Sequence, residues 1–257
     1  MEIHGNYYIK TLSPVGTPGG FGFVEHVILY NSDHNKCGSY AKKTLLLDNF
    51  PPEYFEEVKE RFKQEVLCQS SCKHKSIVPV YLCNLQAEKP WFIMDLAQND
   101  LASEIQTGKL TLSDKINIIK MVLEGVSFMH KQRDRILHRD IKPQNVLRFS
   151  DGTYKISDFG LIKKESLNGT SKALTKIGAF PMGTERYMAP EVLISTDYSV
   201  QSDIYSLGKL MEDLSIEDYR IKRLIVKSTK MDKADRYTSV DDILSDLENI
   251  TGEVRYD

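Results

Sequence analysis

The amino-terminal part of the chain alternates short runs of strand-forming residues with turns. Three such runs occupy residues 6–12, 21–30 and 39–47. The connection between the second and third, NSDHNKCG, is rich in Asn, Asp, Ser and Gly, as expected of a hairpin. Residues 77–83 and 90–96 predict two further strands. This part of the chain is therefore expected to form a five-stranded antiparallel sheet.

One helix is predicted within this strand-rich part, over residues 51–69. Two prolines stand at its start, where a missing N–H costs nothing. Its apolar side chains recur at intervals of three to four, which places them on one face: Phe55, Val58, Phe62 and Val66. Five strands and one helix together predict a small lobe of mixed α+β structure.

From residue 101 onward the pattern becomes helical. Ser113 is expected to cap a helix over residues 116–133, because apolar residues recur there at helical spacing. Further helices are predicted over residues 200–214, 219–231 and 239–250. This part of the chain should form a larger, mainly helical lobe.

The two parts are expected to form a single α+β domain with two lobes. No Ser/Gly-rich linker and no internal repeat interrupts the sequence. The boundary is therefore predicted to be a hinge at residues 95–98, between a small lobe of residues 1–94 and a large lobe of residues 99–257.

Composition narrows the functional classes. The chain has 257 residues and a formal net charge of −2, so no overall positive field attracts nucleic acid or an anionic membrane. Its longest apolar runs are too short to span a bilayer, and the first residues lack the pattern of a signal peptide. The four cysteines fit a reducing compartment. We expect a cytoplasmic protein.

The segment from His138 to Gly160 carries the strongest chemical signal. It reads HRDIKPQN, then a short strand–turn–strand, then DFG. Two aspartates, an asparagine and a lysine would lie side by side on two loops held by the hairpin: Asp140, Asp158, Asn145 and Lys142. Phosphoryl transfer needs a base, metal ligands and a cation near the phosphate, because the protein mainly positions groups and neutralises charge.

This segment resembles the catalytic and metal-binding loops of the eukaryotic-type (Hanks-type) serine/threonine protein kinases. The resemblance covers nearly the whole chain, and the strings RFKQE and RYTSVDDIL look most like the compact bacterial branch. It implies a two-lobed kinase fold that uses ATP and Mg²⁺. Asp140 would be the base, Lys142 would neutralise charge on the γ-phosphate, and Asn145 and Asp158 would hold the magnesium ions.

The nucleotide-binding parts of the family occur upstream in the expected order. PVGTPGGFGFV looks like the glycine-rich loop, with Gly16, Gly19, Gly20 and Gly22 giving backbone N–H groups access to the phosphates. YAKK resembles the strand of the phosphate-pairing lysine, here Lys43, and Glu65 would be its ion-pair partner. Lys42 should point to the opposite face.

WFIMDLAQNDL looks like the hinge of the family. By analogy Met94 would be the gatekeeper, and the segment from Asp95 to Ala97 would offer backbone groups to the adenine edge. The apolar walls around the adenine would be Val24, Ala41 and Leu147.

Further motifs concern the class of substrate, the structural support of the catalytic loop and its regulation. Lys142 and Thr184, in GTERYMAPE, both resemble the serine/threonine branch. Glu191 would pair with a buried Arg236, and Asp203 would brace the catalytic loop. Arg139, before the base, is the arrangement associated with activation by loop phosphorylation. The candidate phosphorylation sites are Thr170, Ser171 and Thr175, although a merely mobile polar loop explains this segment equally well.

Three positions depart from the family pattern. Thr17 stands where the first glycine of the loop is expected, with Gly16 adjacent. Between Ile216 and Arg236 there is room for one helix only, so the extra helix that the family uses for docking is predicted to be absent. Gln69 occupies a usually apolar position, and a buried amide there needs hydrogen-bond partners.

The sequence therefore predicts a serine/threonine protein kinase that acts on protein substrates, including its own activation loop. ATP and a protein substrate are the expected partners, with no nucleic acid and no membrane, and the oligomeric state is not indicated. One alternative is a pseudokinase that binds nucleotide without transfer. Another is a small-molecule kinase, which would place phosphate on a metabolite.

Overall fold

The structure is a computed structural model that describes residues 1–16, 22–159, 163–164 and 185–253. Contacts within it divide the chain into two units. The first comprises Met1–Lys73 and Val78–Ala97, and the second comprises His74–Ile77 and Gln98–Asp257.

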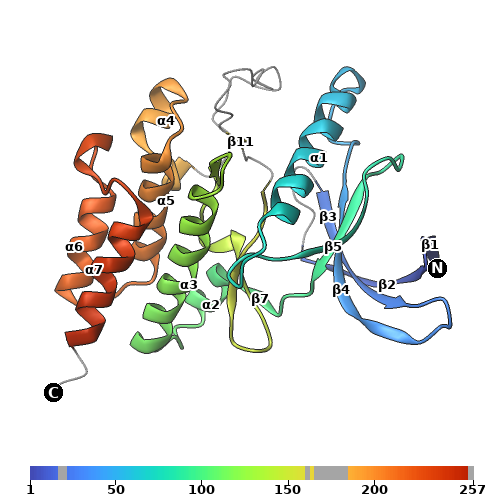
Figure 1. The fold of residues 1–257 in the computed structure, drawn as a ribbon, viewed down its shortest axis with the longest axis horizontal. Helices are drawn as coiled ribbons and strands as arrows, with labels where there is room; N and C mark the ends of the chain where they lie inside the picture. The colour runs from blue at the N-terminus through green and yellow to red at the C-terminus, as the bar shows by residue number, and fades with distance from the viewer. Residues whose placement is uncertain (17–21, 160–162, 165–184, 254–257) are drawn as a thin grey trace. The chain divides into compact units, whose positions relative to one another are not determined.

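A six-stranded antiparallel sheet forms most of the first unit, in the order β1-β2-β3-β4-β6-β5 (Figure 1). Its strands are β1 (Glu2–His4), β2 (Tyr7–Val15), β3 (Gly22–Tyr30), β4 (Lys36–Leu45), β5 (Val80–Asn84) and β6 (Trp91–Asp95). One face of the sheet is built around buried Ile9, Val27, Leu29, Trp91 and Ile93. The alternation of apolar and polar residues thus located five of the six strands.

Within this six-stranded sheet, the strand that the sequence did not predict is β1. Its three residues pair with β2, Glu2 opposite Ile9 and His4 opposite Tyr7. Three residues are too few to show a period of two. Side-chain contacts hold this strand in place, because Glu2 forms an ion pair with Lys42 and the His4 ring meets the Trp91 ring edge-on at 5.0 Å.

The α-helix found among the described residues of the first unit is α1 (Phe55–Ser71), preceded by a 3-10 turn over Pro52–Tyr54. The prolines end before the regular helix begins. Val58, Phe62 and Val66 are buried along one face, as the spacing predicts. Glu65 lies on the same buried face, which brings a carboxylate into an apolar region.

Residues 74–77 join the second unit although they lie between two elements of the first. Ile77 forms a parallel bridge with Ile156, and the carbonyl of Ser76 accepts a 2.8 Å hydrogen bond from the Ile156 N–H. The His74 ring stacks on Phe128 at 4.9 Å. These contacts fasten the segment to the second unit.

The second unit is mainly helical, and Figure 1 shows α3, α5, α6 and α7 packed beside one another. Its helices are α2 (Leu101–Gln106), α3 (Leu112–His130), α4 (Pro190–Ser195), α5 (Val200–Asp213), α6 (Tyr219–Ser228) and α7 (Val240–Glu253). Thr111 caps α3 instead of Ser113. The Thr111 hydroxyl accepts from the Asp114 N–H while the Asp114 carboxylate accepts from the Thr111 N–H, which completes a capping box two residues before the predicted cap.

The second unit also contains five short strands, which form two small sheets. β7 (Asn99–Asp100), β9 (Val146–Arg148) and β10 (Tyr154–Ile156) form one sheet, while β8 (Ile136–Leu137) pairs with β11 (Lys163–Lys164). The β9–β10 hairpin is the strand–turn–strand predicted between the two loops. Further 3-10 turns cover Pro143–Asn145, Glu185–Tyr187 and Lys233–Asp235.

The expected α+β class is confirmed, and the sheet of the first unit has one strand more than predicted. Between residues 216 and 236, all of which the structure describes, α6 is the single α-helix, as predicted. Within the described parts of the chain, no helix has the length and apolar character needed to cross a membrane.

Candidate active site

Asp140 is the centre of a small polar cluster in the second unit. The Asn145 amide donates to the Asp140 carboxylate at 3.0 Å and to its backbone carbonyl at 2.8 Å. The Lys142 ammonium lies 2.8 Å from the same carboxylate oxygen. The Pro143–Asn145 turn folds the chain back so that Asn145 reaches Asp140. Three of the four predicted groups are therefore in direct contact.

His138 ties this loop to the second one. Its Nδ1 accepts from the Asp140 N–H at 3.3 Å, so its Nε2 must carry the hydrogen that is donated to the Ser157 carbonyl at 3.1 Å. The Asn145 carbonyl in turn accepts from the Ser157 N–H at 2.9 Å. Asp158 directly follows Ser157, whose carbonyl and N–H are both hydrogen-bonded to the first loop, so these bonds hold the backbone next to Asp158.

Two non-glycine residues here have positive φ, Arg139 at 68° and Asp158 at 61°. Such a backbone conformation costs free energy and persists only where neighbouring contacts impose it. For Arg139 those contacts come from Asp203, on α5. Its carboxylate accepts from the N–H groups of His138 and Arg139 at 2.8 and 2.9 Å. The prediction that Asp203 braces this loop is confirmed.

Asp203 also receives a hydrogen bond from His130, at the end of α3, across 2.9 Å. Burial by itself would raise the pKa of Asp203, but the His130 contact and the loop N–H groups outweigh it. The pKa of this carboxyl therefore lies below its usual range. Asp203 therefore remains ionised and accepts the hydrogen bonds from the N–H groups of His138 and Arg139.

The donor set near Asp140 suits a hard cation. The amide nitrogen of Asn145 is used within the loop, so its carbonyl oxygen is left for a metal. Asp158, half-buried on the neighbouring loop, supplies a carboxylate. Mg²⁺ takes few protein oxygens and completes its shell with water and phosphate. In the described parts of the chain, no group of three or more His, Cys, Asp or Glu side chains is arranged to hold a metal ion.

In the first unit, Lys43 pairs with Glu65. The Lys43 ammonium lies 2.6 Å from the Glu65 carboxylate, and the side chains are 13% and 4% exposed. Lys42, next along β4, points to the opposite face and pairs with Glu2. Strand alternation predicted this division between the two lysines.

The residues expected to bind the nucleotide fall into two groups. Lys43 lies opposite Val24, and Ala41 lies opposite Met94. Directly paired antiparallel residues share a face, as do positions i and i+2, so these four side chains lie on one face of the sheet.

The other members lie elsewhere in the fold. Asp95 ends β6 and accepts a 2.7 Å hydrogen bond from the Tyr81 hydroxyl, while Ala97 is the last residue of the first unit. Leu147 belongs to the second unit, on β9.

Two of the predicted loop glycines are described. Gly16 has φ of 68°, and a Cβ there would meet no described atom within 4 Å, so the positive φ is what favours glycine at this position. Gly22 is buried, and a Cβ would lie 2.6 Å from the Thr44 carbonyl oxygen. Its requirement for glycine comes from close strand packing, which the sequence did not suggest. Gly19, Gly20, Thr184 and the candidate phosphorylation sites Thr170, Ser171 and Thr175 lie outside the described residues.

Two supporting contacts had no signal in the sequence. His130 reaches Asp203 from 73 positions away, and the Arg139 guanidinium lies over the Tyr198 ring at 4.2 Å. Gln69 is buried, as its position implied, and its amide donates to the Val78 carbonyl at 2.9 Å. Its carbonyl oxygen has no hydrogen bond among the described residues.

Comparison with known proteins shows which protein family this chain resembles. A family model described as a protein kinase domain matches residues 10–249. The chain is 27% identical to the probable serine/threonine-protein kinase CPE1738 of Clostridium perfringens, over 97% of this chain and 39% of that protein.

Two eukaryotic relatives have a higher sequence identity to this chain over a smaller share of it. The G-type lectin S-receptor-like serine/threonine-protein kinase SD1-1 of Arabidopsis thaliana is 33% identical over 60% of this chain and 19% of that protein. The dual specificity protein kinase FUZ7 of Mycosarcoma maydis is 31% identical over 82% of this chain and 45% of that protein. The chain thus spans less than half the length of each of these relatives.

Proposed function

This chain belongs to the protein kinase family, and we propose that it transfers the γ-phosphate of ATP to serine and threonine hydroxyls of protein substrates. The observation that carries the proposal is the Asp140 cluster. Its carboxylate is oriented by Asn145 and neutralised by Lys142 on a loop fastened to Asp203. Phosphoryl transfer depends on this kind of positioning.

Asp140 would accept the proton of the substrate hydroxyl and orient its oxygen toward the γ-phosphate. The Lys142 ammonium lies 2.8 Å from the Asp140 carboxylate. It would also neutralise negative charge on the transferred phosphate. Asn145 and Asp158 would hold magnesium, which supplies positive charge to the phosphate oxygens when bound.

Lys43 would bind the α- and β-phosphates of ATP. Glu65 fixes its ammonium from a buried position on α1, which reduces the entropy lost when phosphate binds. Val24, Ala41, Met94 and Leu147 would form the apolar surround of the adenine, and the backbone from Asp95 to Ala97 would bind its edge. Gly16, Gly19, Gly20 and Gly22 would let the backbone approach the phosphates.

The choice of serine and threonine is supported by Lys142 and Thr184 and by the names of the relatives. The same reasoning extends to the chain's own activation loop, where Thr170, Ser171 and Thr175 are the candidates. We propose a cytoplasmic protein with ATP and a protein substrate as partners.

Transfer of labelled phosphate from Mg-ATP tests this function. We expect the chain to label itself and a generic basic protein, and the Asp140→Asn variant to lose transfer while it binds a fluorescent ATP analogue as before. Asp151→Asn is the matched control, because Asp151 is exposed on the β9–β10 turn and its hydrogen bonds within the described part of the chain go to Thr153. Appreciable turnover by Asp140→Asn would contradict the role of Asp140 as base.

The rival functions predict different results. A pseudokinase would bind the nucleotide and label no protein. A small-molecule kinase would place phosphate on a metabolite and would not depend on Thr184. Comparison of phosphoproteomes from cells with the wild-type chain and the Asp140→Asn variant would then identify the substrates.

A further inference from the structure

A row of basic side chains runs along the exposed face of α6. Figure 1 shows this helix at one edge of the group of helices in the second unit. Its apolar side chains face the protein interior, where Ile221, Leu224 and Ile225 are buried. Six exposed residues form the opposite face, namely Tyr219, Lys222, Arg223, Val226, Lys227 and, just after the helix ends, Lys230. Spacings of three and four residues place them in one row, which we call the α6 row.

The α6 row is basic, with an apolar residue at its centre. Four of its six residues are lysine or arginine, and none is acidic. Val226 lies between these cations in the sequence and is 56% exposed. Interfaces between proteins commonly place an apolar contact at the centre and polar contacts around it. The row thus offers both kinds of contact to one ligand.

Three cations of the row have no carboxylate partner within the described parts of the chain. The side chains of Arg223 and Lys230 form no ion pair or hydrogen bond there. The Lys227 ammonium lies over the face of the Tyr237 ring, 3.9 Å from its centre. A cation can hold such a ring contact and still bind an anion from the solvent side, because an ammonium has three donors.

The fourth cation, Lys222, forms an ion pair with Glu217. The two side chains are 50% and 88% exposed. An ion pair so open to water contributes little free energy, and an incoming carboxylate can compete for the lysine.

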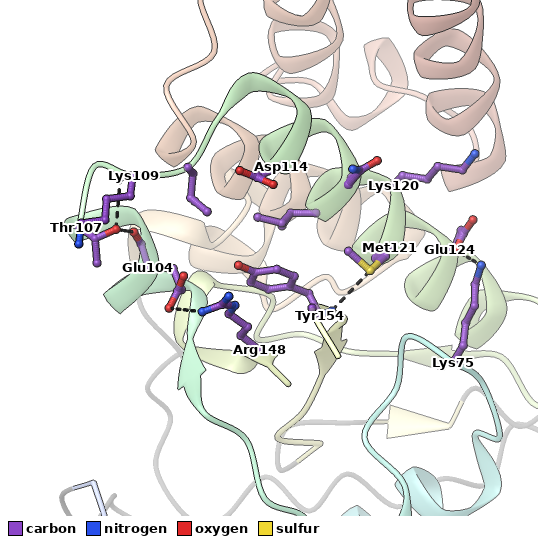
Figure 2. Close-up of a pocket in the computed structure, with 14 residues that line it drawn as sticks. Lys75, Glu104, Thr107, Lys109, Asp114, Lys120, Met121, Glu124, Arg148 and Tyr154 are labelled. Atoms are coloured by element: carbon purple, nitrogen blue, oxygen red, sulfur yellow. Dashed lines mark hydrogen bonds and ion pairs between the residues drawn. The ribbon is translucent and has the colours of Figure 1, made fainter. Parts of the chain in front are cut away.

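Cations elsewhere in the second unit lie close to carboxylates. Figure 2 shows several of them around a pocket between α2, α3 and the β9–β10 hairpin. The ion pairs there are Arg148–Glu104 at 3.5 Å, Lys75–Glu124 at 2.9 Å and Lys120–Glu248 at 3.2 Å. The α6 row differs, because most of its charge is not balanced by the chain itself.

The carboxylates on the neighbouring helix, α7, are bound by other donors. Asp242 accepts hydrogen bonds from the Thr238 hydroxyl at 2.7 Å and from the Ser239 N–H at 3.0 Å. Asp246 accepts a hydrogen bond from the Tyr237 hydroxyl at 2.8 Å. These acids serve α7 and the loop before it, and the cations of the α6 row remain open to a ligand.

Acidic residues limit the row at both ends. Glu217 and Asp218 precede the helix, while Asp232 and Asp235 follow the row. Its four basic residues span about 12 Å at the rise of an α-helix, which about four residues of an extended peptide would match. A long polyanion or an anionic membrane surface would bring its charge against the acids at the ends. The charge pattern therefore favours a short anionic segment.

We propose that the α6 row binds a short acidic segment of a partner protein, in which an apolar side chain stands between carboxylates. The apolar side chain would pack on Val226, and the carboxylates would pair with Arg223, Lys227 and Lys230. None of the residues proposed to bind ATP or to transfer phosphate belongs to the row. The inference therefore goes beyond the proposed kinase activity and does not depend on it.

Fluorescence anisotropy with the full chain tests the proposal. The probe is a fluorescein-labelled peptide with the core Glu-Asp-Leu-Asp-Glu between Gly-Ser flanks. The control peptide has the core Gln-Asn-Leu-Asn-Gln, which keeps the shape and removes the charge. We expect the acidic peptide to bind and the amide peptide to bind at least about tenfold more weakly, with the difference shrinking as salt is added.

Substitutions then locate the site. The double variant Arg223→Glu, Lys230→Glu should weaken binding of the acidic peptide about tenfold or more, and Val226→Ser should weaken it about threefold. The matched control is Lys109→Glu, Arg133→Glu, which changes the net charge equally. Both of its residues are exposed in the second unit and lie outside the row, with Lys109 at the pocket of Figure 2. This control should bind as the wild type does, and equal melting temperatures would show that the variants fold.

Several results would overturn the proposal. The first is equal binding of the acidic and amide peptides. The second is unchanged affinity in the double variant Arg223→Glu, Lys230→Glu, or an equal loss in the control variant, which would mean that overall charge alone decides. The third is tighter binding of phosphatidylserine vesicles or of single-stranded DNA than of the peptide, lost in the same double variant, because the row would then serve a membrane or a nucleic acid.

The binding test is separate from the test of phosphate transfer. No nucleotide is present in the binding experiment, so the Asp140→Asn variant should bind the acidic peptide as well as the wild type does. A chain that binds the peptide without transferring phosphate would support the α6 row and contradict the proposed kinase activity. A chain that transfers phosphate without binding the peptide would do the reverse.

Discussion

Arg236 and Glu191 form a bidentate ion pair, with Nη1 and Nη2 of the guanidinium 2.7 and 2.8 Å from the two carboxylate oxygens. The Arg236 side chain is 0% exposed. Its remaining N–H groups donate to the backbone carbonyls of Lys230, Gln201 and Met231. The predicted pairing is confirmed, and the guanidinium has all five of its donors satisfied.

Glu191→Ala should therefore cost more stability than an ordinary surface substitution. It leaves a buried guanidinium without its counter-charge, a loss of about 3–5 kcal/mol. The double variant Glu191→Ala, Arg236→Met should lose less stability than the sum of Glu191→Ala alone and Arg236→Met alone, because neither charge then remains. Urea unfolding of the four chains measures this coupling, and strict additivity would contradict it.

Asp203 predicts a pH dependence of stability. In the folded chain the pKa of Asp203 lies below the usual 3.8. In the unfolded chain an aspartate has a pKa of about 4. The lowered pKa stabilises the fold above about pH 4, and this contribution disappears as the pH falls through the folded value.

The Asp203→Asn variant isolates this contribution. We expect the difference in unfolding free energy from wild type to be large at neutral pH and to shrink in acid. Denaturant unfolding at neutral pH and at about pH 3 measures both differences. A difference that stayed constant would mean that Asp203 acts through shape alone.

Gly22 and Gly16 should respond differently to substitution. Gly22→Ala would bring a Cβ within 2.6 Å of the Thr44 carbonyl oxygen and should cost about 1–3 kcal/mol. Gly16→Asn meets open space, and asparagine tolerates a positive φ, so we expect a smaller loss. Thermal unfolding compares the two, and an equally stable Gly22→Ala chain would contradict the strand-packing explanation.

Local pattern was enough for some parts of this fold and not for others. The apolar spacing of α1 predicted its buried face, and the alternation of β4 predicted that Lys43 and Lys42 point to opposite faces. The cap of α3 was placed at Ser113 because serine is a common cap, yet the reciprocal bonds of Thr111 and Asp114 decide the position. His130 and Asp203 are 73 positions apart, and no local rule relates residues at that distance. Contacts of that kind depend on how whole helices pack.

Lys43 and Lys42 provide a matched pair of substitutions on one strand. Both are held by a carboxylate, but they lie on opposite faces of β4, Lys43 with buried Glu65 and Lys42 with Glu2. If Lys43 binds the phosphates of ATP, Lys43→Met should reduce the rate of transfer about 100-fold or more, because a charged donor aimed at the phosphates is lost. Lys42→Met removes a similar lysine without removing that donor, so it should retain transfer. Because loss of either ion pair could lower stability, rates are compared well below both melting temperatures. Equal loss of transfer in the two variants would mean that β4 acts only as a structural strand, and that Lys43 has no separate role in binding the nucleotide.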